Sequence, residues 1–273
     1  MWMKFWTLSA KTAALIVLTA SVIAPNSSGV VTIQAANDAF ATDHLGNVYA
    51  SRTNTITKYN SNGQQTGVFT KSRYDMFHDV DPSDPFKVLL FNKTSAEILR
   101  LDNKMAMHGE PLSLFSLGLP NPTNVCNSWD DGVWIYDQSL HELIRINNQG
   151  MIDQRSGNLG QLMPENTEIS MIREKNFLLY VAAPAKGLFV FDRYANHIRT
   201  IPEKGIRSFQ AMSNMIIFCR KGEVHSLHTR TAQTKVLHVP GNTNKCLDAR
   251  IEGRLIFIRT KDAISIHPHN FNL

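Results

Sequence analysis

Residues 132–147 read GVWIYDQSLHELIRIN and contain two short β-forming runs on either side of a polar turn. The first run, residues 133–136, is apolar without interruption, which is typical of a strand buried on both faces. The second run, residues 142–146, mixes apolar and charged side chains and ends at Asn147, a residue that favours turns. The segment therefore predicts two neighbouring strands joined by a tight connection.

The same pair of runs recurs along the chain. The apolar runs lie at residues 46–51, 86–92, 132–137, 176–182, 214–220 and 253–259. Equivalent apolar positions near the ends of the second runs are 36 to 45 residues apart, about 41 on average, and are occupied by Tyr59, Leu101, Ile146, Phe191, Leu227 and Ile266. A helical repeat of this length would need two amphipathic helices per unit, and the sequence contains no such pattern.

A period of 40–45 residues filled by four short strands is the signature of a β-propeller blade. We therefore predict an all-β, six-bladed β-propeller with four-stranded antiparallel blades over residues 25–273. The apolar runs are predicted to be the inner strands, covered on both sides by neighbouring blades. The second runs are predicted to lie further out, with Lys58, Arg100 and Arg145 reaching toward solvent.

The last repeat ends at Leu273, too soon after its third strand to supply a fourth. An open ring would expose two unpaired strand edges. The unassigned β-forming segment, residues 29–36, is therefore expected to supply the outer strand of the final blade and close the ring.

The N-terminus is predicted to be a secretory signal peptide. Lys4 and Lys11 precede twelve apolar or small residues at 13–24, too few for a helix to cross the hydrocarbon core of a membrane. The cut is expected near residues 20–24; a cut after Ala35 is the alternative, but it would remove most of the closing strand. The protein is therefore expected to be periplasmic or secreted, with no transmembrane span after the signal is removed.

The three cysteines, Cys126, Cys219 and Cys246, are too few for a disulfide scaffold. Cys219 lies in an apolar strand run, where a packed free thiol is expected. Cys126 and Cys246 each precede equivalent strands, and a bridge stays open as the alternative. We expect three free thiols.

The charge balance argues against nucleic-acid binding. The chain has 28 basic and 23 acidic residues, a net charge of +5 spread along its length. Nothing in it resembles the basic stripe that grips a phosphate backbone. Apolar residues make up 43% of the chain, enough for a folded core.

The order ATD-x-LGNVYAS, TITKYNSNG, PFKVLLFNK, EILRLD, SWDDGVWIYD, ELIRIN, GLFVFD and IPxKGIRSFQ is similar to a group of secreted single-propeller proteins of Gram-negative bacteria. The resemblance covers nearly all of residues 38–267. It implies export and a propeller of NHL-like or YncE-like general form. The group has no assigned activity, so the resemblance carries over no catalytic residues.

Few residues suggest chemistry. The acidic segment Asp79-Val-Asp81-Pro-Ser-Asp84-Pro lacks the Gly and Glu of a calcium loop and is interpreted as a turn. Trp129, Asp130 and Asp131 are expected to form a turn that leads into a strand. A tryptophan beside two acids on the rim would also serve as a stacking surface for a sugar or a peptide. We expect no catalytic residues, no metal site and no cofactor.

The sequence therefore favours a non-enzymatic binding or scaffold protein of the cell envelope, with a protein or glycan partner and no nucleic acid. The alternative is a propeller enzyme of the lactonase, lyase or glycosidase type, with its site at the mouth of the central channel. Because the inner runs are apolar at their centres, its catalytic groups would have to come from loops.

Overall fold

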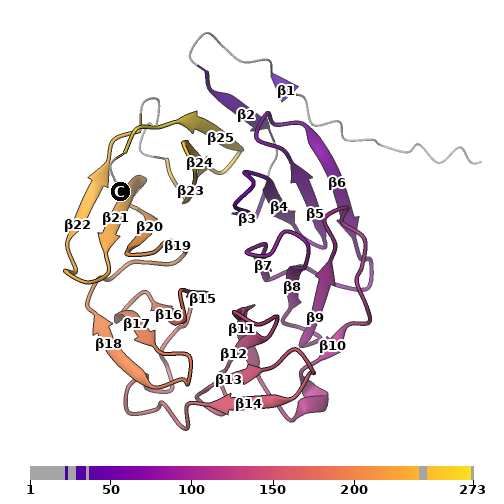
Figure 1. Cartoon of the computed structure of the whole chain (residues 1–273), viewed down its shortest axis with the longest axis vertical. Coiled ribbons are helices and arrows are strands. Elements are labelled where there is room, and N and C mark those ends of the chain that lie inside the picture. Colours follow the sequence, from indigo (N-terminus) through magenta and orange to yellow (C-terminus); the bar gives the residue numbers. More distant parts are fainter. Residues whose placement is uncertain (1–21, 24–28, 35–36, 240–244, 272–273) are drawn as a thin grey trace, which may run out of the picture.

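The computed structural model describes residues 22–23, 29–34, 37–239 and 245–271. Their strands form six sheets arranged in a ring around a central axis (Figure 1). The predicted six-bladed β-propeller with four antiparallel strands per blade is confirmed. Helical structure in these residues is confined to one 3-10 turn, η1 (Phe115–Leu117). None of the described segments is a helix long and apolar enough to cross a membrane.

The four strands of each blade run outward from the axis. The innermost strands, which contact one another around the ring, are β3 (Ala39–Thr42), β7 (Asp79–Asp81), β11 (Pro122–Asn127), β15 (Met171–Lys175), β19 (Phe209–Ala211) and β23 (Asp248–Glu252). The second strands are β4 (Val48–Arg52), β8 (Val88–Asn92), β12 (Val133–Asp137), β16 (Leu178–Ala183), β20 (Met215–Arg220) and β24 (Leu255–Arg259).

The third and fourth strands complete the blades. The third strands are β5 (Thr55–Tyr59), β9 (Glu97–Leu101), β13 (Glu142–Ile146), β17 (Gly187–Phe191), β21 (Glu223–His228) and β25 (Ala263–Pro268). The outermost strands are β6 (Gln65–Thr70), β10 (Leu112–Ser113), β14 (Ile152–Arg155), β18 (His197–Ile201), β22 (Thr234–Leu237) and, in the sixth blade, β2 (Val31–Gln34), which also pairs with β1 (Val22–Ile23).

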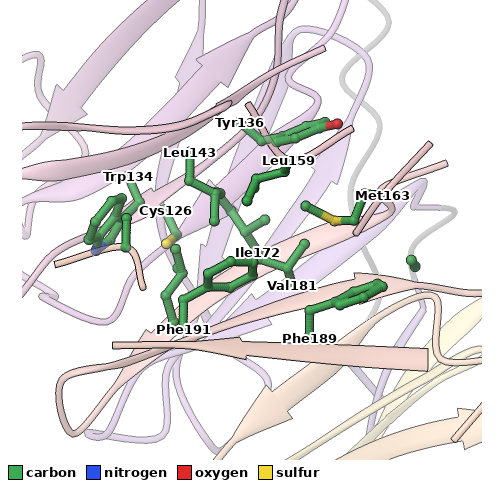
Figure 2. Packing of buried hydrophobic residues seen from close by; sticks show 13 residues of the cluster. Cys126, Trp134, Tyr136, Leu143, Leu159, Met163, Ile172, Val181, Phe189 and Phe191 are labelled. Atoms are coloured by element: carbon green, nitrogen blue, oxygen red, sulfur yellow. The ribbon is translucent and has the colours of Figure 1, made fainter. Parts of the chain in front are cut away.

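Each second strand is buried on both faces because a blade has a neighbour on either side. In β12, Trp134 and Tyr136 pack against the fourth blade, whereas Val133 and Ile135 pack against the second. Figure 2 shows the first of these interfaces, a cluster in which Trp134 and Leu143 of the third blade share one core with Val181 and Phe191 of the fourth. Because side chains alternate along a strand, neighbouring residues point to opposite faces and belong to two different apolar clusters.

The apolar runs are the second strands of the blades, covered on both faces by neighbouring blades as predicted. One detail of the sequence prediction was wrong. Lys58 and Arg145, expected to reach solvent, are 7% and 3% exposed. The Nζ of Lys58 donates to the carbonyl of Asn103 in the next blade, and Arg145 pairs with Asp130 and Asp153. Both charged side chains are therefore buried against partners, Lys58 in the next blade and Arg145 within its own.

The turn between the third and outermost strands has the same hydrogen bonds in four blades. An Asn or Asp side-chain oxygen accepts the backbone N–H groups two and four residues later, and the residue three later has a positive φ. The turns begin at Asn60, Asp102, Asn147 and Asp192. Because the side chain supplies the turn's hydrogen bonds, the two residues after it are free to vary.

The ring is closed by the N-terminal strand, as the sequence predicts. Strand β2 pairs antiparallel with β25, with Val31 opposite Ile266 and Gln34 opposite Ala263 (Figure 1). Ile33 is 2% exposed and belongs to an apolar cluster shared by the sixth and first blades. A Cβ on Gly63, in the first blade, would come within 2.8 Å of Val31, so this glycine permits close approach.

The expectation of three free thiols was wrong. Cys219 at the end of β20 and Cys246 before β23 form a disulfide, with their Cα atoms 5.8 Å apart. The bond joins the fifth blade to the sixth. Only Cys126 among the three is free, and burial raises the pKa of its thiol. The sequence comparison of equivalent positions in different blades did not identify this disulfide. Its two cysteines occupy non-equivalent positions in adjacent blades.

The role of β2 in closing the ring can be tested by a substitution that removes side-chain volume and leaves the backbone pairing intact. Ile33→Ala removes buried contacts between the last and first blades and should cost about 2–5 kcal/mol. We expect the thermal midpoint, followed by circular dichroism, to fall by roughly 5–15 °C. Gln34→Ala, on the same strand but exposed, should leave the midpoint nearly unchanged. Equal midpoints for the two variants would contradict closure through β2.

The disulfide should stabilise the ring measurably. The two cysteines are 27 residues apart, and a closed loop of that size corresponds to about 3.5 kcal/mol of lost unfolded-state entropy. Adding a reductant should therefore lower the urea midpoint of the parent chain. A Cys126→Ala variant should respond to reductant like the parent, whereas a Cys219→Ala, Cys246→Ala variant should not respond. A parent chain that is insensitive to reductant, with its bond verified as reduced, would refute the prediction.

Candidate functional site

A cavity of about 250 Å³ lies where the innermost strands of five blades end. We call it the axial cavity. Its polar lining comes from Thr42, Asp43, His44, Asp81, Ser83, Arg173, Glu174, Lys175, Gln210, Arg250 and Glu252. The cavity opens on the face that carries the loops between the innermost and second strands, hereafter the loop face.

Most of these polar side chains belong to strands or follow them directly. The sequence expectation that any catalytic groups would have to come from loops therefore overlooked the innermost strands, which supply polar side chains to this cavity. The segment 79–84, interpreted as a turn, is strand at Asp79 and Asp81 and turns only afterwards, where Asp84 accepts the N–H of Phe86. Each innermost strand precedes an apolar run and carries at least one polar residue, a signal that the search for apolar runs did not detect.

Arg173 connects three blades below the axial cavity. Its guanidinium donates to both carboxylate oxygens of Asp79, at 2.6 and 3.2 Å, and to the carbonyls of Val80 and Val125. Burial opposes the charge on Arg173, but the nearby carboxylates of Asp79 and Asp81 together outweigh burial and raise the pKa of Arg173. The side chain therefore stays charged and fixed, and it holds the second, third and fourth blades in register.

Two glutamates in the lining share one arrangement. One oxygen of Glu252 accepts from the Thr42 hydroxyl at 2.7 Å and from the Gln210 amide at 2.8 Å. One oxygen of Glu174 likewise accepts from the Ser128 hydroxyl and the Trp134 indole, both at 2.7 Å. Burial raises the pKa of both carboxyl groups and outweighs these hydrogen bonds. Each glutamate thus links its own blade to a neighbour while lining the cavity.

A second cavity of about 380 Å³, the rim groove, adjoins the axial cavity and shares Ser83, Glu174 and Lys175 with it. The groove is also lined by Trp129, Asp131, Phe177, Arg100, Asp84, Asn127, Ser128 and Asn176. The two cavities therefore adjoin on the loop face, and the rim groove extends over the second, third and fourth blades.

Two of the three residues nominated from the sequence, Trp129 and Asp131, line this groove. Trp129 is 52% exposed, and its ring meets the edge of the Phe177 ring at a centroid distance of 5.8 Å. Asp131 lines the groove and forms an ion pair with Lys87 at 2.5 Å. Asp130 is not in the lining; it pairs with the buried Arg145, whose guanidinium lies over the Trp129 ring. The predicted turn into the strand is present at these residues.

Exposed apolar side chains gather on the loop face. The loops between innermost and second strands carry Leu45, Phe86, Trp129 and Phe177 in the first four blades, each at least 50% exposed. Met151 and Tyr194 add to them from turns that open on the same face. Leu247 is the exposed large apolar residue that precedes an innermost strand, at the opposite face. Sequence periodicity could not find this apolar arc, because the loops lie between the repeating runs.

Comparisons with known proteins show similarity of fold. No known family model matches the chain, and no curated protein sequence does. Solved structures do: virginiamycin B lyase from Staphylococcus aureus superposes with a TM-score of 0.60 at 13% identity, over 90% of this chain and 93% of the lyase. The WD40 repeats of RRP9 give 0.62 at 8% identity, over 92% and 100%. BamB from Moraxella catarrhalis gives 0.52 at 11% identity, over 92% and 96%.

At these identities the likeness establishes the propeller alone. The resemblance to secreted NHL-like or YncE-like proteins therefore remains a prediction beyond the fold itself. One of these neighbours is named as a lyase and another as BamB, so the fold does not choose between catalysis and binding.

The pKa shift of Glu252 makes a prediction for stability. The pKa of Glu252 is higher in the folded than in the unfolded chain, so the protonated side chain favours folding. This contribution to stability is complete below the pKa of an unfolded glutamate, about 4.3, and is lost as the pH rises through the pKa of the folded chain. Glu252→Gln should therefore be more stable than the parent at pH 7, and this advantage should vanish below about pH 4.

Glu203 is a control of opposite sign. Burial opposes its charge, but hydrogen bonds from Thr234 and Arg220 outweigh burial and lower its pKa. Glu203→Gln should therefore lose stability at pH 7 and match the parent at low pH. Urea unfolding across this pH range measures both variants. A Glu252→Gln chain that is less stable than the parent at pH 7 would contradict the assignment.

Proposed function

We propose that this chain is an exported, non-enzymatic binding module of the cell envelope that holds a protein partner on its loop face. The observation that carries the proposal is the apolar arc of Leu45, Phe86, Trp129 and Phe177 beside a polar cavity. Exposed apolar side chains gathered on one face of a soluble domain are typical of a protein interface.

The polar groups of the axial cavity support a scaffold role. Asp81 accepts the N–H groups of Ser83 and Asn127, and Glu174 and Glu252 each accept from a neighbouring blade. These carboxylates hold the blades together, so the loops above them are mounted on a rigid ring. A preorganised surface loses little conformational entropy when a partner binds.

Export is supported by two independent features. The N-terminal segment has the charge and apolar pattern of a signal peptide, and the fifth and sixth blades are joined by the Cys219–Cys246 disulfide. Because residues 31–34 close the ring, we propose that the signal is cut before them, near residues 20–24.

A glycosidase-like, lactonase-like or lyase-like enzyme is the second candidate. It is favoured by the two glutamates with raised pKa and by Lys175, which line one cavity. In this function one carboxyl group would donate a proton and the other would accept one. Turnover of a glycan, lactone or peptide library that is lost in both Glu174→Gln and Glu252→Gln would favour it over the binding module.

The binding module is tested by photo-crosslinking in the intact envelope. A benzophenone amino acid at position 86 or 177 should give a discrete covalent adduct with one protein, because both positions are exposed on the loop face. The same amino acid at position 198, exposed on outermost strand β18, should not. Adducts of equal yield at all three positions, or at none, would contradict the proposal.

Truncation of side chains to alanine then measures how much the loop face contributes to the affinity for the partner. Trp129→Ala with Phe177→Ala should weaken partner binding at least about tenfold, as expected for aromatic hot spots. Ile198→Ala with Val236→Ala removes exposed apolar groups from outermost strands and should leave binding unchanged.

A further inference from the structure

The turn that joins β17 to β18 presents an arginine and a tyrosine to the loop face. It is one of the four turns with a shared backbone, here fixed by Asp192, whose Oδ1 accepts the N–H groups of Tyr194 and Asn196. Equivalent positions in the first three blades are Ser61 and Asn62, Asn103 and Lys104, and Asn148 and Gln149. Folding of the turn therefore does not require Arg193 and Tyr194 at these places.

Three aromatic rings surround the Arg193 guanidinium. Its carbon lies 5.4 Å from the centroid of Trp129, 5.9 Å from that of Phe177 and 4.9 Å from that of Tyr194. Trp129 comes from the third blade and the other two rings from the fourth, so the arrangement crosses a blade interface. Contacts over ring faces restrict the orientation of a guanidinium and leave its N–H groups at the edge available.

Arg193 has no hydrogen bond or ion pair to any residue that the structure describes. Asp192 beside it is occupied by the turn and by the Asn196 side chain. Other arginines near the groove are engaged: Arg145 by two carboxylates and Arg100 by Asn127 and two carbonyls. Lys175, which lines the groove, is also exposed and has no ion pair in the described part of the chain.

Phe177 occupies a backbone position that disfavours it. Lys175 pairs with Leu178, so Asn176 and Phe177 form a two-residue hairpin turn, with φ values of 52° and 63°. Such turns usually place Gly second, and a bulky residue there costs about 1–2 kcal/mol. The chain therefore holds this ring beside Arg193 against a local backbone preference.

We propose that Arg193 with the rings of Trp129, Phe177 and Tyr194 is a receptor for a carboxylate that the protein partner carries beside an apolar side chain. The proposal rests on the binding function assigned to the loop face. A carboxylate matches the paired N–H donors of the guanidinium, and the rings contact the neighbouring apolar group. A flat sugar is disfavoured because two guanidinium groups and the Phe177 edge already lie against the Trp129 ring.

The test selects a random peptide library displayed on phage against the full chain. Selected peptides should be enriched in Asp or Glu next to Leu, Ile or Phe. Replacing that acid by Asn or Gln, or making Arg193→Gln in the protein, should weaken binding at least about tenfold, as expected for a charge-assisted hydrogen bond. Arg193→Lys keeps the charge but loses the planar donor pair and should restore only part of the affinity.

Arg207→Gln is the matched control, because Arg207 is an exposed arginine in the connection that precedes β19, at the opposite face. It should bind the selected peptides like the parent. A selection without binders, peptides without an acid, or binding that survives Arg193→Gln would overturn the proposal. Binding of arrayed neutral glycans that depends on Trp129 would overturn it as well. If the envelope crosslinks at positions 86 and 177 persist in any of these cases, the protein interface stands and only the carboxylate receptor fails.

Discussion

Every sheet in this molecule depends on a neighbour to cover its apolar faces, and the ring satisfies this requirement only when it closes. Each of the six apolar clusters is shared by two consecutive blades. The cluster between the sixth and first blades combines side chains from both ends of the chain, among them Ile33 of β2. Closure through β2 thus helps to cover the apolar faces that the first and last blades would otherwise expose, and it completes the ring of six clusters.

Closure also explains why polar residues can line the axis. The second and third strands supply the apolar contacts between blades, so the innermost strands are free to carry charged groups. These groups are then satisfied across blade boundaries, as with Arg173 on Asp79 and Glu252 on Thr42 and Gln210. Because each bond joins side chains of different blades, the network resists relative movement of the blades and keeps the loop face in one geometry.

The sequence was informative where a physical requirement repeats. The apolar runs recur with the blade period, and the lack of a last strand required a partner from the N-terminus; both interpretations hold in the structure. It was less informative where a residue's environment depends on contacts outside its own strand. Nothing local distinguishes Arg145, buried between two carboxylates, from an exposed arginine, and nothing places Cys219 opposite Cys246. The short polar strand Asp79–Asp81 was taken for a turn because three residues show no usable period.

The repeat pattern of the sequence predicts little of the candidate site. This departure from the repeat is itself evidence about the role of the site. Four turns share one hydrogen-bonding pattern, which fixes the backbone whatever side chains follow the first residue. Three of them carry small or polar residues at the two variable positions, whereas the fourth carries Arg193 and Tyr194 next to Trp129 and Phe177. Neither closure nor packing requires these side chains, and Phe177 even opposes the preference of its turn. The fold does not need these exposed aromatic and charged side chains, one of which has an unfavourable backbone conformation. Binding of a ligand is the best explanation for their concentration on one face.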